Sequence, residues 1–364
     1  MVNFSETKLR AGAVALALLF CTLAPATLLA ESAPTMELAA SEGLQESALP
    51  GMKVLRDRRA KVSRVIVAEV LPMGGVAAEL ELDYQGKFVR YPVRFERVEE
   101  AGCKAWKLSW APEETYTGAL LNMVSSGQLP ETTTAATTSW IAQRRLPSMP
   151  VVLTRFQIIT PYGSIMIAEF VDKIDPSQKG AQVAPPPLLY KHTKRWISEF
   201  LQDDPGPAGV DIIADKRATW ADFNRVIVGA LSQGFYQVNI ITSGQGGVAA
   251  LPVTAPIKPV PLVVRYYPFE QASGFRVSSG AGLVRDEGVC DPEMSFCVTS
   301  AEQFDARLTK LGAEARAADP AGADFVMFAT TGEVALGDAV RWIERMGVGL
   351  EIAQRRVLIG FIQK

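Results

Sequence analysis

The stretch "VDIIADKRATWADFNRVIVGALSQGFYQVNIIT", residues 210–242, carries the clearest structural signal in this chain. Its apolar start predicts a strand that ends at Ala214 and Asp215. A polar turn follows, and from Trp220 the apolar residues recur at helical spacing as far as Gly234, which predicts an amphipathic helix with a glycine stop. The last residues, rich in β-branched side chains, predict a second strand. The stretch is therefore a strand, helix and strand unit.

A similar unit recurs near the C-terminus as "ADFVMFATTGEVALGDAVRWIERMGVGLEI", residues 323–352, with Ala329 corresponding to Ala214 and Asp338 to Asp222. Strand and helix patterns precede both units, so the same order of elements is expected over residues 150–242 and 261–364. The run 243–260, rich in Gly and then in Pro, is expected to be a linker. The sequence thus predicts an internal repeat.

Residues 63–130 show the two-residue alternation of antiparallel strands. In "VAAELELDY", residues 76–84, the alternation assigns Leu80 and Leu82 to the core face and Glu79 and Glu81 to the solvent face. The phrase "AWKLSWAPEETYTGALL" that follows resembles the strand ending of small cystatin-like or nuclear-transport-factor-like sheet domains. Residues 31–62 are expected to form a tether and a first helix. The Thr- and Ala-rich residues 131–149 are expected to form a linker.

Residues 1–30 have the order of an export signal, in which Lys8 and Arg10 precede an uncharged, largely apolar stretch. Cleavage after Ala26 and cleavage after Ala30 both fit the small-residue pattern. A stretch of about twenty apolar residues is also long enough to stay in a bilayer as an anchor. We therefore expect an exported, periplasmic protein, with an uncleaved segment at the inner membrane as the alternative.

The cysteines fit an oxidising compartment. Cys290 and Cys297, in "CDPEMSFC", are close enough in sequence to close a small loop, so we expect a disulfide between them and a free, buried Cys103. The chain has one histidine, His192, which leaves too few ligands for a structural zinc site. His192 lies among Lys and Arg residues, and we expect it on a solvated helix face.

Residues 210–242 resemble the end of the periplasmic domain of the ExbD/TolR family of biopolymer-transport proteins. That family has an apolar strand ending in Ala-Asp, a later aromatic residue, an amphipathic helix and a Gly before the last strand. The residues that carry this likeness are Ala214, Asp215, Trp220, Asp222 and Gly234 in the first copy, and Ala329 and Asp338 in the second.

This resemblance implies a fold and a role. The expected fold class is α+β, with an N-terminal antiparallel sheet domain followed by two small α/β sandwich domains of ExbD/TolR-like type. Family members work with a proton-conducting partner through an Asp in their membrane helix, but residues 11–30 contain no Asp or Glu. The resemblance therefore implies the role of the soluble domain alone, which is to pair with itself and to contact peptidoglycan or other envelope proteins.

The matched residues also have a structural explanation, because Asp215 and Asp222 bracket a helix start, where carboxylates accept unpaired amide hydrogens. We expect no catalytic, cofactor-binding or metal-binding residue, since the sequence has no phosphate-binding or dinucleotide-binding motif. The formal net charge of −2 gives no reason to expect a nucleic-acid partner. A non-enzymatic envelope scaffold is the favoured function, and an exported enzyme with a site between domains is the alternative.

Overall fold

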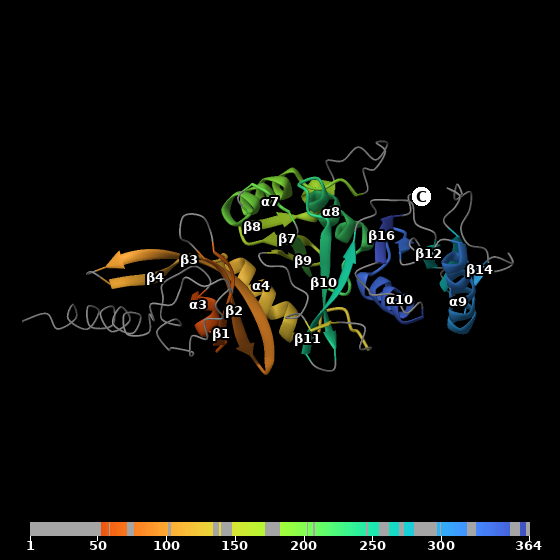
Figure 1. Cartoon of the computed structure of the whole chain (residues 1–364), viewed down its shortest axis with the longest axis horizontal. Helices are drawn as coiled ribbons and strands as arrows, with labels where there is room; N and C mark the ends of the chain where they lie inside the picture. Colours follow the sequence, from red (N-terminus) through yellow and green to blue (C-terminus); the bar gives the residue numbers. More distant parts are fainter. Residues whose placement is uncertain are drawn as a thin grey trace, which may run out of the picture. The chain divides into compact units, whose positions relative to one another are not determined.

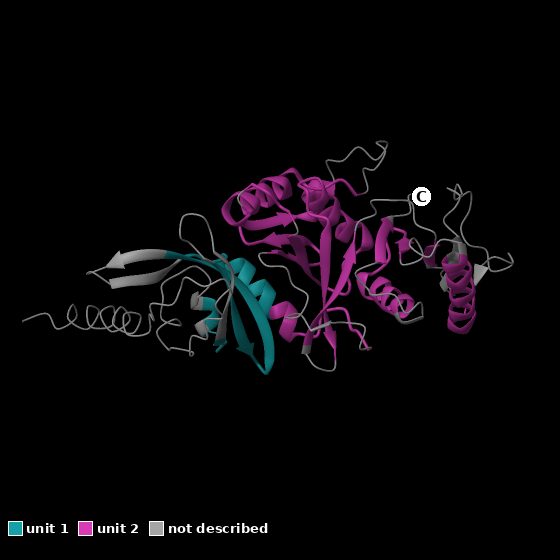
Figure 2. Ribbon diagram, in the orientation of Figure 1, with its two compact units in different colours: residues 1–121 teal, residues 122–364 magenta. Residues whose placement is uncertain are grey.

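The computed structural model describes residues 52–57, 59–70, 76–100, 103–133, 138–139, 148–171, 183–201, 203–206, 208–244, 247–254, 262–268, 273–279, 297–298, 300–318, 325–349 and 357–361. The chain is of mixed α+β class and divides into two compact units, residues 1–121 and 122–364 (Figure 2).

The first unit is an antiparallel sheet in the order β1-β2-β3-β4, with a short helix before it and a longer one after it. Its elements are α3 (Met52–Asp57), β1 (Lys61–Val70), β2 (Val76–Tyr84), β3 (Lys87–Glu100), β4 (Cys103–Trp110) and α4 (Glu114–Ser125), the last of which ends just inside the second unit. Helix α4 is tied to the sheet by Thr117, whose hydroxyl donates to the Tyr91 hydroxyl at 3.0 Å. Leu80 and Leu82 are buried, as the alternation predicted.

The other face of β2 differs from the prediction. Glu79 and Glu81 are buried rather than solvated, and the Arg90 guanidinium of β3 pairs with both at 3.1 Å. Alternation identifies the two faces of a strand, but it does not reveal that the charged face is covered as well. Charges are tolerated in such a place when they are paired, as they are here.

The second unit is built on one mixed sheet (Figure 1). Its first half contains β5 (Thr138–Ser139), β6 (Met149–Leu153), β7 (Gln157–Thr160), β8 (Gly163–Met166), α6 (Ile167–Val171), α7 (Pro187–Phe200), β9 (Gly209–Ala214), α8 (Trp220–Leu231), β10 (Gln237–Gly244) and β11 (Gly247–Thr254). Its second half contains β12 (Leu262–Pro268), β13 (Ser273–Ser279), β14 (Cys297–Val298), α9 (Ala301–Ala318), β15 (Val326–Thr330), α10 (Leu336–Gly349) and β16 (Val357–Phe361).

The two halves have the same strand order. The first runs β8-β7-β6-β9-β10 and the second β14-β13-β12-β15-β16. In each half the three strands nearest the middle of the sheet are parallel and the outer two are antiparallel to their neighbours. Figure 1 shows α7 and α8, which connect the parallel strands, together on the same side of the strands, as two connections of the same hand require.

Two segments differ from the sequence expectations. The run 243–260, expected as a linker, contains β11, which pairs along its whole length with β10 and at Thr254 with Leu358 of β16. β11 includes Pro252, which lies opposite Asn239 of β10, and the apolar residues on both sides of this proline form a strand because β10 lies beside them. The run 150–171, whose two apolar stretches around "TPYG" predict two strands, instead contains β6, β7 and β8 followed by α6, and a turn at residues 154–156 separates β6 from β7.

The two halves also contact each other through matching turns at the starts of α8 and α10. Trp220 N donates to Val334 O, and Leu336 N donates to Ala218 O, both at 2.8 Å. With Trp220 matched to Leu336 and Ala218 to Val334, each bond is the counterpart of the other. The same holds for Ala221 N to Gly332 O at 3.0 Å and Gly337 N to Lys216 O at 2.8 Å, so the contact is a pseudo-two-fold one.

Trp220 fills the space beside this contact. Its indole is fully buried, and its Nε1–H donates to Gly360 O of β16 at 3.0 Å. The ring meets Phe328 of β15 edge-on, with 5.7 Å between centroids. A side chain of the first half is therefore part of the core of the second.

Candidate functional site

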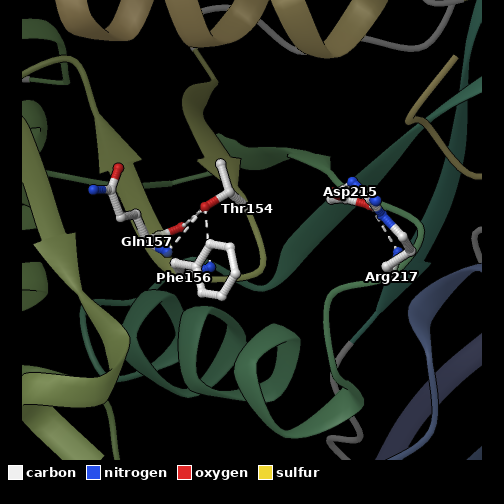
Figure 3. Close-up of polar contacts among 5 residues, drawn as sticks. All are labelled: Thr154, Phe156, Gln157, Asp215 and Arg217. Atoms are coloured by element: carbon white, nitrogen blue, oxygen red, sulfur yellow. Dashed lines mark hydrogen bonds and ion pairs between the residues drawn. The ribbon is translucent and has the colours of Figure 1, made fainter. Parts of the chain in front are cut away.

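The carboxyl ends of the parallel strands β6 and β9 lie next to each other, and polar loops follow both. In sheets of this kind, the loops at the carboxyl ends are the usual place for functional residues. Asp215 N donates to Leu153 O at 2.8 Å, which fixes the relative position of the two strand ends. Figure 3 shows the residues that follow them.

The first loop, residues 154–157, is called here the hairpin turn. The Thr154 hydroxyl accepts from the amides of Phe156, at 3.2 Å, and Gln157, at 2.9 Å (Figure 3). Thr154 N donates to Gln157 O at 2.9 Å, so β7 turns back directly against β6. This closed turn leaves Arg155 and Phe156 on the surface, and the Phe156 side chain is 64% exposed.

The second loop, residues 215–218, is called here the site turn. Asp215 Oδ1 accepts from Arg217 N at 2.9 Å and Nε at 3.0 Å, while Oδ2 accepts from Nη2 at 2.8 Å (Figure 3). The Asp215 side chain is almost buried, and the Arg217 side chain is exposed. The carboxylate thus fixes the direction of a surface guanidinium by a bidentate pair.

The charge balance of the site follows from this pairing. Burial by itself would raise the pKa of Asp215, but the hydrogen bonds and charge of Arg217, with the charge of Arg155, hold the pKa below its ordinary value. The Arg155 guanidinium lies over the Phe156 ring, 5.5 Å from its centroid. The two neighbouring loops therefore present an exposed aromatic ring with one guanidinium over it, and a second guanidinium paired with Asp215.

The backbone of the site turn is held from several directions. Lys216 N donates to Gln128 O at 2.7 Å, and the Lys216 ammonium pairs with Glu131 at 3.1 Å. The residues around Glu131 also reach β10, because Thr132 N donates to Ser243 O at 2.9 Å. The start of the segment expected as a linker, residues 131–133, is thus part of this edge of the sheet.

A second polar cluster lies under α7. His192 is buried, contrary to the expected solvated position, because its side chain turns toward β7, where Nδ1 lies 2.7 Å from the Thr160 hydroxyl. Burial, together with the charge of Arg195, lowers the pKa of His192. The Tyr162 hydroxyl donates to Glu199 at 2.8 Å, and Arg195 lies over the Tyr162 ring. This cluster joins the β7–β8 hairpin to α7.

The residues that carry the family resemblance mostly have structural positions. Ala214 and Ala329 are buried near the ends of β9 and β15. Asp222 lies in the first turn of α8 and accepts a hydrogen bond from the Thr219 hydroxyl, which in turn caps Asp222 N at 3.1 Å. Asp215 is different, because it pairs with Arg217 before the helix begins.

The remaining matched residues also take part in local contacts. Gly234 follows α8 with φ of +91°, the left-handed conformation expected of a helix stop. Asp338 pairs with Arg341 at 2.8 Å, and Asp222 forms the counterpart pair with Arg225 in the first half. Both pairs lie in the first turns of their helices.

The predicted disulfide stays a prediction, since Cys297 lies in β14 but Cys290 lies outside the described residues. Cys103 begins β4, and its side chain is outside the described part of the chain. Residues 1–30, expected as an export signal, are also outside it. Among the described residues, no cluster of His, Cys, Asp and Glu has the arrangement of a metal site. None of the described helices is long and apolar enough to cross a membrane.

No family model, curated protein or solved structure matches this chain. The likeness to ExbD/TolR domains therefore remains an interpretation of the sequence.

Sequence reasoning found Asp215 but missed Arg155, Phe156 and Arg217. The signal that could have identified Arg217 was its position two residues after an Asp at a strand end, where Asp commonly closes a local turn. Arg155 and Phe156 were missed because the apolar stretch before "TPYG" has the pattern of one continuous strand. In such a strand, the alternation assigns Phe156 to the core face.

Proposed function

We propose that this protein is a non-enzymatic scaffold of the cell envelope, in which two ExbD/TolR-like domains are fused into one pseudo-symmetric pair. The pair binds another envelope component through the surface formed by the hairpin turn and the site turn. The observation that carries this proposal is the exposed Phe156 and Arg155 beside the fixed Asp215–Arg217 pair.

The composition of this surface supports binding. Aromatic and Arg side chains are the residues most enriched at the energetic centres of protein interfaces. A guanidinium group recognises carboxylates, which occur both in acidic protein segments and in the peptide stems of peptidoglycan. Because the turns are closed by their own hydrogen bonds, little conformational entropy is lost when a partner binds.

The alternative, an exported enzyme, finds less support among the described residues. The Thr160 hydroxyl and the His192 imidazole lie within hydrogen-bonding distance, as a nucleophile and its base would. Thr160 is fully buried, however, and its hydroxyl also donates to Gly163 O at 3.2 Å. The Thr160–His192 pair therefore joins β7, β8 and α7, which is a structural role.

The test is site-specific photo-cross-linking in the native envelope. A photoreactive phenylalanine analogue at Phe156 is expected to capture a defined partner. The same analogue at Tyr236 is the matched control, because Tyr236 is also exposed (52%) but precedes β10, at the opposite edge of the same half. Equal labelling from both positions, or none from Phe156, contradicts the proposal.

A second measurement separates the two kinds of partner. The purified mature protein is mixed with isolated peptidoglycan sacculi and sedimented. If the protein co-sediments with the sacculi and Arg155→Glu abolishes this, the surface binds peptidoglycan. If the protein does not co-sediment, but position 156 forms a protein cross-link that Arg155→Glu abolishes, the surface binds an envelope protein.

A further inference from the structure

We infer that the second repeat is a positioning element for the binding surface of the first: the amides of Leu336 and Gly337, at the start of α10, hold the site turn in the conformation that presents Arg217. This inference rests on the proposed function of that surface, and it assigns a role to the second copy that the function itself does not require.

The contact is made by the backbone of the site turn. Gly337 N donates to Lys216 O and Leu336 N donates to Ala218 O, both at 2.8 Å. These carbonyls lie on either side of Arg217. The first amides of a helix have no partner within their own helix, so they are available as donors to an external acceptor. The site turn supplies these acceptors, so the two amides of α10 and the carbonyls of Lys216 and Ala218 are all hydrogen-bonded.

Gly337 is the residue that makes this approach possible. A Cβ atom at this position would lie 3.0 Å from Lys216 Cβ and 3.1 Å from Lys216 O. Both distances are shorter than an ordinary van der Waals contact, and the second is to backbone. A larger residue at position 337 therefore has to push the site turn away from α10.

The reciprocal half of the contact holds a different turn. Trp220 N and Ala221 N donate to Val334 O and Gly332 O. In the register of these turn contacts, which is one residue later than the match of Ala214 to Ala329 in the strands, Thr331 and Glu333 stand at the positions of Asp215 and Arg217. The fused pair is therefore symmetric in its backbone contacts and asymmetric in its charges. The turn of the second repeat is held by equivalent backbone hydrogen bonds, but it has no counterpart of the Asp215–Arg217 pair.

The experiment uses the full mature chain with Gly337→Val. The expected result is that the amides at positions 336 and 337, which donate to the site turn in the wild type, exchange with solvent about five- to tenfold faster, as the loss of a hydrogen bond of ordinary strength predicts. Exchange at the Arg217 amide, which donates to Asp215 Oδ1, is expected to rise as well, because the turn is no longer held. In the same variant the pKa of the Asp215 carboxyl, followed by NMR, is expected to rise toward its ordinary value, because Arg217 no longer stays in place. Cross-linking from position 156 is expected to fall in parallel.

Gly118→Ala is the control, because a Cβ atom at Gly118 in α4 meets nothing within 4 Å. It is expected to leave all three measurements unchanged. If Gly337→Val also removes amide protection from β9 and β10, the smaller Gly337→Ala replaces it with the same measurements.

The outcomes separate the two proposals. An unchanged Asp215 pKa and unchanged exchange at Arg217 in the folded Gly337 variant overturn the positioning role, whatever the cross-linking shows. A changed pKa without any change in a cross-link that forms in the wild type also overturns it, since the turn would then not matter for binding. The absence of a cross-link in the wild type removes the proposed function, and the pKa and exchange results still decide whether α10 holds the turn.

Discussion

At the residue scale, Asp215 links stability to pH in a direction that can be tested. Its folded pKa lies below the ordinary value, so its contribution is complete above about pH 4 and is lost as the pH falls through the folded pKa. We expect Asp215→Asn to reduce the free energy of unfolding at pH 7 by about 1 kcal/mol, a small value because Arg217 is exposed. The variant should also lose less stability than the wild type between pH 4 and pH 2. Denaturant unfolding over this range checks both, and parallel pH curves would contradict the role of the pair.

The contribution of His192 to stability also decreases as the pH falls, but for a different reason. Its folded pKa is lowered by burial and by Arg195, so the unfolded chain binds a proton more readily than the folded one. Its contribution is complete above about pH 6.5 and declines as the pH falls from there toward the folded pKa. We expect His192→Asn, whose amide group keeps a donor near the Thr160 hydroxyl, to flatten the stability curve in this window. Because the chain has one histidine, its ring signals in an NMR titration give the pKa directly.

At the element scale, the end of α8 depends on Gly234. Its φ of +91° disfavours other residues, and an added Cβ would lie 2.7 Å from Pro205 Cγ. Gly127 also has a positive φ, of +67°, but a Cβ there meets nothing within 4 Å. We expect Gly127→Ala to cost about 1 kcal/mol from backbone strain alone, and Gly234→Ala about 2–4 kcal/mol, because crowding is added. Thermal unfolding of the two variants tests this difference. Equal decreases in Tm would show that crowding at Gly234 contributes nothing.

Some elements could be predicted from the sequence and others could not. Helix α8 could be predicted because its cap, its apolar spacing and its glycine stop are all local signals between Thr219 and Gly234. Strand β11 could not, because its sequence becomes a strand only beside β10. The buried Glu79 and His192 were misassigned for a related reason. Their burial depends on partners distant in sequence, Arg90 and Thr160, which no local pattern reveals.

At the scale of the whole molecule, the processing of the N-terminus distinguishes two forms of the protein. The order of Lys8 and Arg10, the apolar stretch and the small-residue sites predicts export with cleavage. We expect mass measurement of the protein from its native envelope to give a chain that begins at Thr27 or Glu31. A chain that retains residues 1–26 would instead support the membrane-anchored form.

The pairing of the repeats makes a prediction about how the second unit unfolds. Trp220 of the first half donates to Gly360 O in the second, and the backbone bonds between the two turns cross the same boundary in both directions. Opening one half alone would therefore expose a buried indole and leave amides and carbonyls of the other half without partners, which costs several hydrogen bonds. We expect the slowest-exchanging amides of β9 and β15 to share one opening free energy, and Trp220→Ala to lower both by about 3–5 kcal/mol. Native-state hydrogen exchange in low denaturant measures each strand separately. If β15 opened at lower denaturant than β9, and Trp220→Ala changed β9 alone, the repeats would be independent domains.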